Sequence, residues 1–166
     1  IQPLESSFAA YMGTGEVHVL VDGTISDYLQ GVELTDVKAL FANPNAVLAL
    51  KEDKTVEVWG SPKLTDISAI DEQLVNVNKV LVVAGGSRPD TQAGAFVVLT
   101  EEGNLFSWGS EALSNNLTSI ASVVSNSDAI AALTDRGEVV VWGADDFGGD
   151  ASAVEDRLKN IVSIHA

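Results

Sequence analysis

The 166-residue chain contains no cysteine and only two histidines, His18 and His165. Without cysteine it cannot form disulfides, thiolate metal sites or a cysteine nucleophile. Two histidines cannot supply a three-histidine zinc site. No apolar run approaches the roughly 20 residues that a membrane-spanning helix requires. What remains is a chain with ample material for an aliphatic core, since hydrophobic residues make up 46% of it.

Positive charge is also scarce. Nine Lys and Arg residues face 24 Asp and Glu residues, and the formal net charge is −15. Such a surface repels the phosphate backbone, so we expect no nucleic-acid partner. A basic protein, a cation or simple solubility fits the charge better.

The start of the chain shows no signal peptide. It begins at Ile1 rather than Met, so we expect a processed mature chain or an excised fragment. That weakly favours a secreted, cell-surface or organelle-lumen location, although composition leaves the compartment open.

One fourteen-residue phrase occurs four times without a gap, at 7–20, 46–59, 95–108 and 129–142. Each copy has an apolar run, a polar turn and a second run rich in β-branched residues, a pattern typical of a β-hairpin. Gly103 and Gly137 suit the turn because glycine tolerates positive φ. Lys54 stands at the same place and predicts either a left-handed residue or a different turn.

A second phrase precedes three of the hairpins, starting at Leu34, Leu74 and Leu117 with identical spacing, and predicts a leading strand beside each hairpin. It occurs once more at 158–166, where no hairpin follows. We expect this closing strand to pair with the N-terminal hairpin and close a ring, which removes exposed sheet edges. An open array could also begin with a hairpin that lacks its leading strand and end with a leading strand that lacks its hairpin.

Two connectors share a pattern, at 68–74 and 152–158, and predict short helical turns. Ser152 and Glu155 have the spacing of a capping box.

The combined motif resembles the regulator of chromosome condensation repeat. It runs from an apolar strand through an acidic turn with glycine to a Trp-Gly pair. The residues that carry it are Leu50, Trp59 and Gly60; Leu99, Gly103, Trp108 and Gly109; and Leu133, Gly137, Trp142 and Gly143. The first copy departs from it, with Leu20 and Val21 in place of Trp-Gly. The resemblance implies a mainly β, four-unit propeller-like repeat over residues 1–166, or a segment of an open or larger propeller array.

Candidate site residues divide into structural and binding groups. We interpret Trp59, Trp108 and Trp142 as core residues that bury a large area and find a partner for the indole N–H. The insertion at 84–94 could present Arg88, Pro89 and Asp90 to a partner, or be merely tolerated. Weak calcium candidates are Asp145, Asp146 and Asp150, whose spacing does not match an EF-hand loop; a solvated turn is the preferred interpretation.

No nucleophile elbow, phosphate loop or metalloprotease motif is present, so we expect no enzyme activity and no cofactor. The leading hypothesis is a non-catalytic protein-interaction or structural accessory module, as a subunit of a larger assembly or part of a larger surface protein. The second is an adhesin-type domain that binds a glycan or peptide, with or without calcium. The third is a module similar to a guanine-nucleotide exchange factor.

Overall fold

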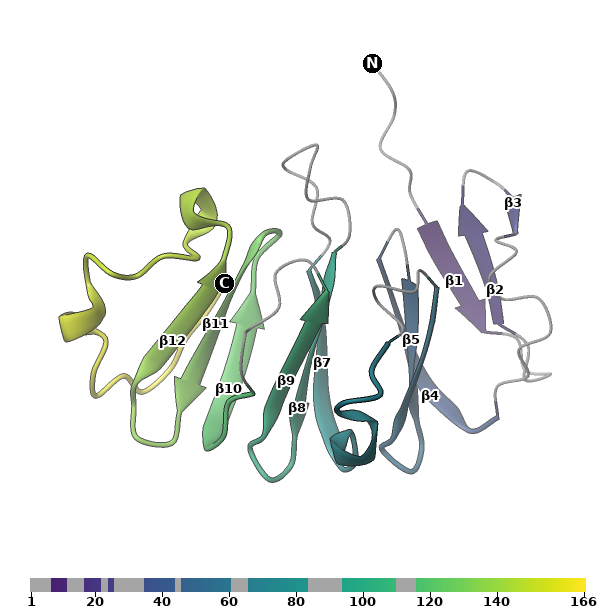
Figure 1. The fold of residues 1–166 in the computed structure, drawn as a ribbon, viewed down its shortest axis with the longest axis horizontal. Coiled ribbons are helices and arrows are strands. Elements are labelled where there is room, and N and C mark those ends of the chain that lie inside the picture. The colour runs from purple at the N-terminus through teal and green to yellow at the C-terminus, as the bar shows by residue number, and fades with distance from the viewer. Residues whose placement is uncertain are drawn as a thin grey trace, which may run out of the picture. The chain divides into compact units, whose positions relative to one another are not determined.

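The structure is a computed structural model. It describes the backbone of strands 7–11, 17–21 and 24–25, and the backbone and side chains of 35–43, 46–60, 66–83, 94–109 and 116–166. The described strands form four three-stranded antiparallel sheets (Figure 1). This confirms the prediction of a mainly β, propeller-like fold. Ring closure and the number of units in a complete ring stay predictions. The chain divides into two compact units, Ile1–Asn76 and Val77–Ala166, which we describe separately.

The first unit holds two sheets and one helical turn. Its first sheet has the order β1-β2-β3 and its second the order β4-β5-β6. A 3-10 helix, η2, follows at Asp71–Gln73 in the first predicted connector. The strands are β1 (Ser7–Tyr11), β2 (Val17–Val21), β3 (Thr24–Ile25), β4 (Val37–Asn43), β5 (Ala46–Lys51) and β6 (Val56–Gly60).

The second unit repeats the same plan twice, with sheet orders β7-β8-β9 and β10-β11-β12. Two 3-10 helices follow the last strand, η3 at Asp145–Phe147 and η4 at Glu155–Arg157. The strands are β7 (Val77–Val83), β8 (Ala95–Thr100), β9 (Leu105–Gly109), β10 (Ile120–Ser125), β11 (Ala129–Thr134) and β12 (Val139–Gly143).

Each leading strand carries an irregularity that the sequence did not reveal. The register of β4, β7 and β10 shifts by one residue just after the first pair, as in a β-bulge. Immediately before each of these strands, and again before Ile161, stands a residue with φ between +52° and +60°. These residues are Asp36, Asn76, Ser119 and Asn160. Asp and Asn enter the left-handed region more readily than most other residues, which accounts for three of these four positions.

Two segments differ from the expected plan. In the first sheet the third strand is β3, which pairs with β2, so β1 lies at the edge of this sheet among the described strands. At the other end no strand is assigned over the predicted closing strand, 158–166. That segment instead hydrogen-bonds to β12 and to the turn before it, through Leu158 and Ile161.

The three described hairpin turns share one geometry. The N–H of Thr100 donates to the carbonyl of Asn104 (2.9 Å), and that of Gly103 donates to the carbonyl of Thr100 (3.1 Å). The same bonds recur at 134–138 and at 51–55. This is a three-residue hairpin loop whose last residue is left-handed. Gly103 and Gly137 have φ of +78°, and Lys54 has φ of +66°, so Lys54 takes the left-handed alternative.

In the second unit each turn also contacts the chain segment that comes next. The N–H of Ile120 donates to the carbonyl of Gly103 (2.9 Å), and that of Ile161 donates to the carbonyl of Gly137 (2.8 Å). A Cβ on Gly103 would lie 3.2 Å from the nitrogen of Ile120, and one on Gly137 would lie 3.0 Å from the carbonyl oxygen of Ile161. The turn glycine is therefore required twice, for its φ and for the close approach of the next segment.

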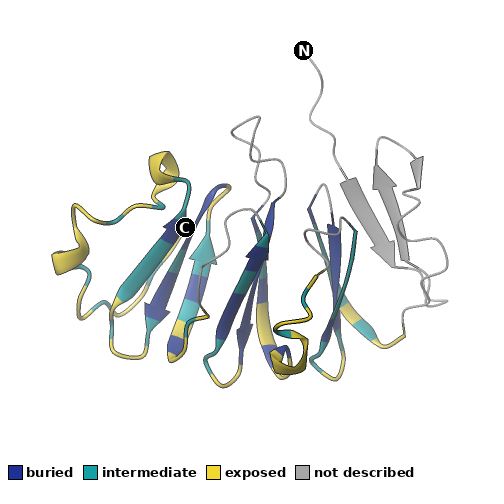
Figure 2. Ribbon diagram, viewed as in Figure 1, coloured by how far each residue is buried: buried dark blue, intermediate teal, exposed yellow. Residues whose placement is uncertain are grey.

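The core of the second unit lies between its two sheets. One side is built by Val97, Leu99 and Leu105, and the other by Ile130 and Trp142, among other buried residues. Figure 2 shows the buried strands β8 and β11 in dark blue. Within the part of the chain that the structure describes, no helix is long and apolar enough to span a membrane.

Replacing the turn glycine should weaken the fold, because the glycine has a positive φ and because the backbone of the next segment lies close to it. We expect Gly137→Ala to lower the free energy of unfolding by about 1–3 kcal/mol, from the left-handed φ and the backbone contact at Ile161. The matched change Lys54→Gly removes left-handed strain but adds chain entropy, so it should change stability by less than about 1 kcal/mol. Urea denaturation measures both. A Gly137→Ala protein as stable as the wild type would contradict this account of the turn.

Candidate functional site

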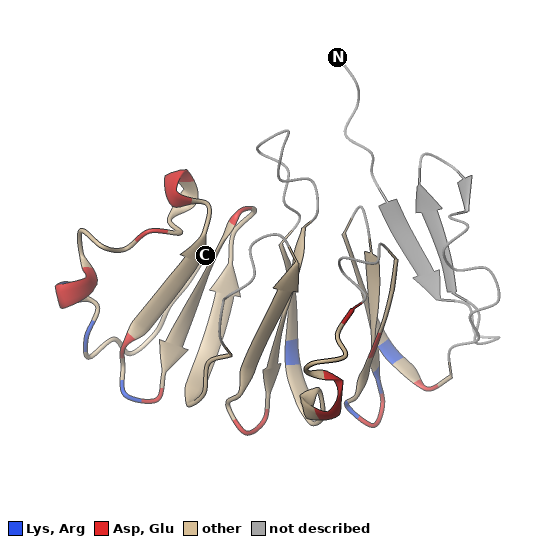
Figure 3. Ribbon diagram, in the orientation of Figure 1, with Lys and Arg blue, Asp and Glu red and all other residues tan. Residues whose placement is uncertain are grey.

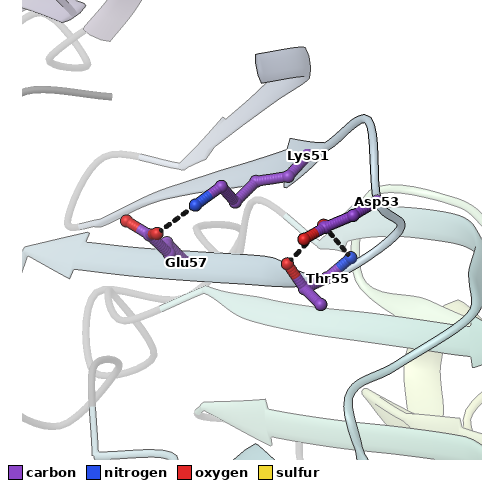
Figure 4. A network of polar contacts seen from close by, with 4 residues as sticks. All are labelled: Lys51, Asp53, Thr55 and Glu57. Atoms are coloured by element: carbon purple, nitrogen blue, oxygen red, sulfur yellow. Dashed lines mark hydrogen bonds and ion pairs between the residues drawn. The ribbon is translucent and has the colours of Figure 1, made fainter. Parts of the chain in front are cut away.

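The turn between β5 and β6 holds the polar network of Figure 4. Lys51 ends β5 and its Nζ lies 2.7 Å from Oε1 of Glu57 on β6. On the same turn, Oδ1 of Asp53 accepts two hydrogen bonds from Thr55, from the backbone N–H at 3.0 Å and from Oγ1 at 2.6 Å. In the other two turns the hydroxyl of a threonine accepts the equivalent backbone N–H, as Thr100 does from Asn104 (3.2 Å). Asp53 thus takes the role of that threonine in the turn that lacks glycine.

These contacts shift two ionisation equilibria. The hydrogen bond to Glu57 raises the pKa of Lys51, although partial desolvation works against the shift. The hydrogen bonds from Thr55, that from its side chain first, lower the pKa of Asp53. Both groups are near the surface, where water screens their charges, so they serve to shape the turn rather than to drive chemistry.

The two connectors share an Asp-x-Ser turn. Oδ1 of Asp66 accepts hydrogen bonds from the Ser68 hydroxyl (2.7 Å) and backbone N–H (3.4 Å). Oδ1 of Asp150 accepts one from the backbone N–H of Ser152 (2.8 Å). The predicted capping box is wrong, because η4 begins after Val154 and has no side-chain cap. The connector pattern predicted from the sequence begins at the serine. It does not include the aspartate two residues earlier, which accepts the hydrogen bonds of that serine.

The weak calcium candidates Asp145, Asp146 and Asp150 do not come together. Among the residues with described side chains, no group of three His, Cys, Asp or Glu is placed to hold a metal ion. Asp145 and Asp146 lie in η3, and all three side chains are exposed. The N–H and hydroxyl of Ser152 lower the pKa of Asp150. Asp150 therefore acts as a turn residue.

The three repeated tryptophans differ in burial. Trp108 and Trp142 are buried, with 8% and 7% of their surface exposed, whereas Trp59 is half-buried. The ring of Trp108 lies 5.7 Å from that of Phe96, centroid to centroid. Nε1 of Trp142 is buried and has no hydrogen-bond partner among the described residues.

Asn126 holds the loop between β10 and β11 and connects it to η3. Its Oδ1 accepts the backbone N–H groups of Asp128 (3.0 Å) and Ala129 (2.7 Å), and its Nδ2 donates to the carbonyl of Phe147 (2.9 Å). Asn43 accepts the N–H of Ala46 in the same way (2.9 Å). These residues tie loops to strand ends. The partner-contact candidates of the insertion, Arg88, Pro89 and Asp90, lie outside the described residues.

No protein-family model matches the chain, and no curated protein matches it by sequence. Solved structures do match its fold. Human WBSCR16 aligns over 84% of this chain with a TM-score of 0.50 and 18% identity. Prp20p from Saccharomyces cerevisiae, described with its binding to Gsp1p and histones, aligns over 77% with a TM-score of 0.45 and 14% identity. Yeast RCC1 (Prp20) in a structure with Kap60 aligns over 80% with a TM-score of 0.47 and 18% identity.

In fold, the chain resembles the regulator of chromosome condensation repeats. It spans less than half of each of these structures: 46% of WBSCR16, and 41% and 40% of the two yeast chains. At 14% to 18% sequence identity, the similarity of this RCC1-like chain to these structures is a similarity of fold alone.

The Asp53 network yields a pH-dependent prediction. Because the folded-state pKa of Asp53 is lowered, its carboxylate contributes stability above its unfolded-state pKa, and this contribution is lost as the pH falls through the lowered value. We expect Asp53→Ala to lower the thermal midpoint at neutral pH and to match the wild type at pH values below the folded-state pKa. Thermal denaturation over an acid pH series measures the difference. Glu52→Ala on the same turn is the control, since it leaves the Asp53–Thr55 bonds in place. A difference independent of pH would show that the carboxylate charge is not responsible.

Proposed function

We propose that this RCC1-like chain is a non-catalytic module that binds a protein partner, as an accessory subunit of a larger assembly or as part of a larger surface protein. The observation that carries the proposal is the use of polar side chains in the described sheets. They terminate strands and shape turns, and they do not converge on a shared pocket of acids and bases.

The buried polar residues illustrate this use. Asn43 caps the turn before β5, and the Thr100 hydroxyl accepts a bond within the turn before β9. Asp128 is buried in the turn before β11, where the hydroxyl of Ser127 donates to it and its backbone carbonyl accepts the N–H of Ala144. Ser163 Oγ and His165 Nε2 lie 3.2 Å apart, but both side chains are exposed, so nothing shields that pair from water. A catalytic nucleophile needs an oriented base and a shielded site, and these contacts support neither.

The exposed face of the turns supports recognition of a basic protein surface. In the second unit the first described turn carries Glu101 and Glu102. The second carries Asp135 and is followed by Glu138, with the basic Arg136 between them, and Figure 3 shows acidic residues in red at both turns. Because the turns are held by several backbone hydrogen bonds, little conformational entropy is lost when a partner docks on them. Charge of this sign disfavours nucleic acid and speeds association with a cationic protein.

The proposal is tested by cross-linking the intact protein in its native source, purifying the cross-linked partner and reconstituting the pair. We expect the affinity to fall as salt is raised. The double change Glu101→Lys and Glu102→Lys should weaken binding about tenfold at low salt, which corresponds to about 1.4 kcal/mol. The control Glu155→Lys and Asp156→Lys alters the charge equally on η4, and should weaken binding less. A turnover that disappears when one polar residue is replaced would overturn the non-catalytic assignment.

A further inference from the structure

Asn116, Leu117 and Thr118 form the one Asn-x-Ser/Thr sequence of the chain, and its middle residue is not proline. An oligosaccharyltransferase recognises this tripeptide as the acceptor of an N-linked glycan. The match is informative only where the fold leaves the asparagine amide accessible and without another role. The structure describes all three residues, in the segment between β9 and β10.

Leu117 fixes the orientation of the tripeptide. It makes an isolated antiparallel bridge with Leu105, through backbone hydrogen bonds of 2.8 Å and 3.1 Å. Its half-buried side chain packs against the core cluster of the second unit. Because successive side chains of a β-bridged segment point to opposite faces, those of Asn116 and Thr118 lie together on the side away from this core. Both residues are exposed, as this orientation requires.

The Asn116 side chain has no structural role among the described residues. Within that part of the chain, neither Asn116 nor Thr118 makes a side-chain hydrogen bond. Other asparagines are used differently. Asn43 and Asn126 accept backbone N–H groups that hold loops, and Asn160 adopts the left-handed conformation before Ile161. A glycan on Nδ2 of Asn116 would therefore break no hydrogen bond of the described fold.

The core contacts on either side of the acceptor would also stay in place. Leu105, which bridges to Leu117, is 0% exposed and belongs to the core cluster. Ile120, which follows the tripeptide, belongs to the same cluster and donates its N–H to the carbonyl of Gly103 (2.9 Å). A bulky hydrophilic group on Asn116 would extend into water and leave this junction between the sheets undisturbed.

We propose that Asn116 is an N-glycosylation site whose donor substrate is a polyprenyl-diphosphate-linked oligosaccharide. In the transfer, Nδ2 of Asn116 forms a bond to C1 of the first sugar while the bond from C1 to the diphosphate oxygen breaks. The polyprenyl diphosphate leaves with the electron pair of that bond, and the amide proton passes to a base of the transferase. Thr118 supplies the hydroxyl that completes the acceptor sequence.

This inference rests on the part of the proposed function that makes the chain part of a larger surface protein, because N-linked glycans are found on secreted and surface proteins. The first test uses the intact protein from its native source. Peptide-N-glycosidase in heavy-oxygen water should convert a glycosylated Asn116 to a labelled aspartate, which mass spectrometry detects in the peptide that contains it. The label separates this conversion from spontaneous deamidation that preceded the treatment.

The second test expresses the protein through the secretory pathway of a eukaryotic host cell. Deglycosylation should then shift the electrophoretic mobility of the wild type. Asn116→Gln and Thr118→Val should each abolish the shift, whereas Thr118→Ser should keep it at lower occupancy. The matched control is Asn78→Gln, which replaces an exposed asparagine of the same unit that has Val80 two residues later and should leave the shift unchanged.

Three results would overturn the proposal: an Asn116 peptide that is wholly unmodified in the native protein, no mobility shift in the secreted wild type, or a shift that survives Asn116→Gln. None of them bears on the proposed protein partner, because that binding is measured on the reconstituted pair and through Glu101 and Glu102. Failure of the glycosylation site and failure of the binding module are therefore distinguishable.

Discussion

The hydrogen bond between a turn carbonyl and the first residue of the next segment is the constraint on which the second unit depends. Gly103 accepts from Ile120 and Gly137 accepts from Ile161, at nearly equal distances. Each bond requires a turn residue with positive φ and no Cβ in the way, and a left-handed residue just before the donor. Ser119 and Asn160 supply the latter. Sheet spacing is thus set by backbone contacts, and the aliphatic side chains fill the space that this spacing leaves between sheets.

The sequence predicts the hairpins well because their pattern is local. Apolar alternation and a three-residue turn place β8 and β9 within a residue of the repeated phrase. The bulges and the left-handed residue before each leading strand escape prediction, since one polar residue in a loop has many possible conformations. Ser152 was assigned the wrong role for a related reason. The carboxylate of Asp150, two residues earlier in the chain, accepts a hydrogen bond from the backbone N–H of Ser152. This local contact takes the place of the predicted helix cap.

The tryptophans show why equal repeat positions need not have equal environments. Trp108 and Trp142 are buried and Trp59 is half-buried, although each is the second-to-last residue of the second strand of a hairpin. Burial of a sheet residue depends on what covers its face, which lies outside its own repeat. Trp142 belongs to an apolar cluster, and its Nε1 has no hydrogen-bond partner among the described residues.

Repeat arrays have ends, and natural arrays usually cover the last apolar face with a polar capping unit. The outer face of the β10-β11-β12 sheet does not have the polar composition of such a unit. Ala131, Val139 and Val141 keep the apolar character that suits an interior face. The charged residues that follow, in η3 and η4, lie in the connectors and not on this face. A leading strand is then placed on the face by the same backbone junction that operates inside the array. This face therefore has both the composition and the backbone junction of the interior faces in the same unit.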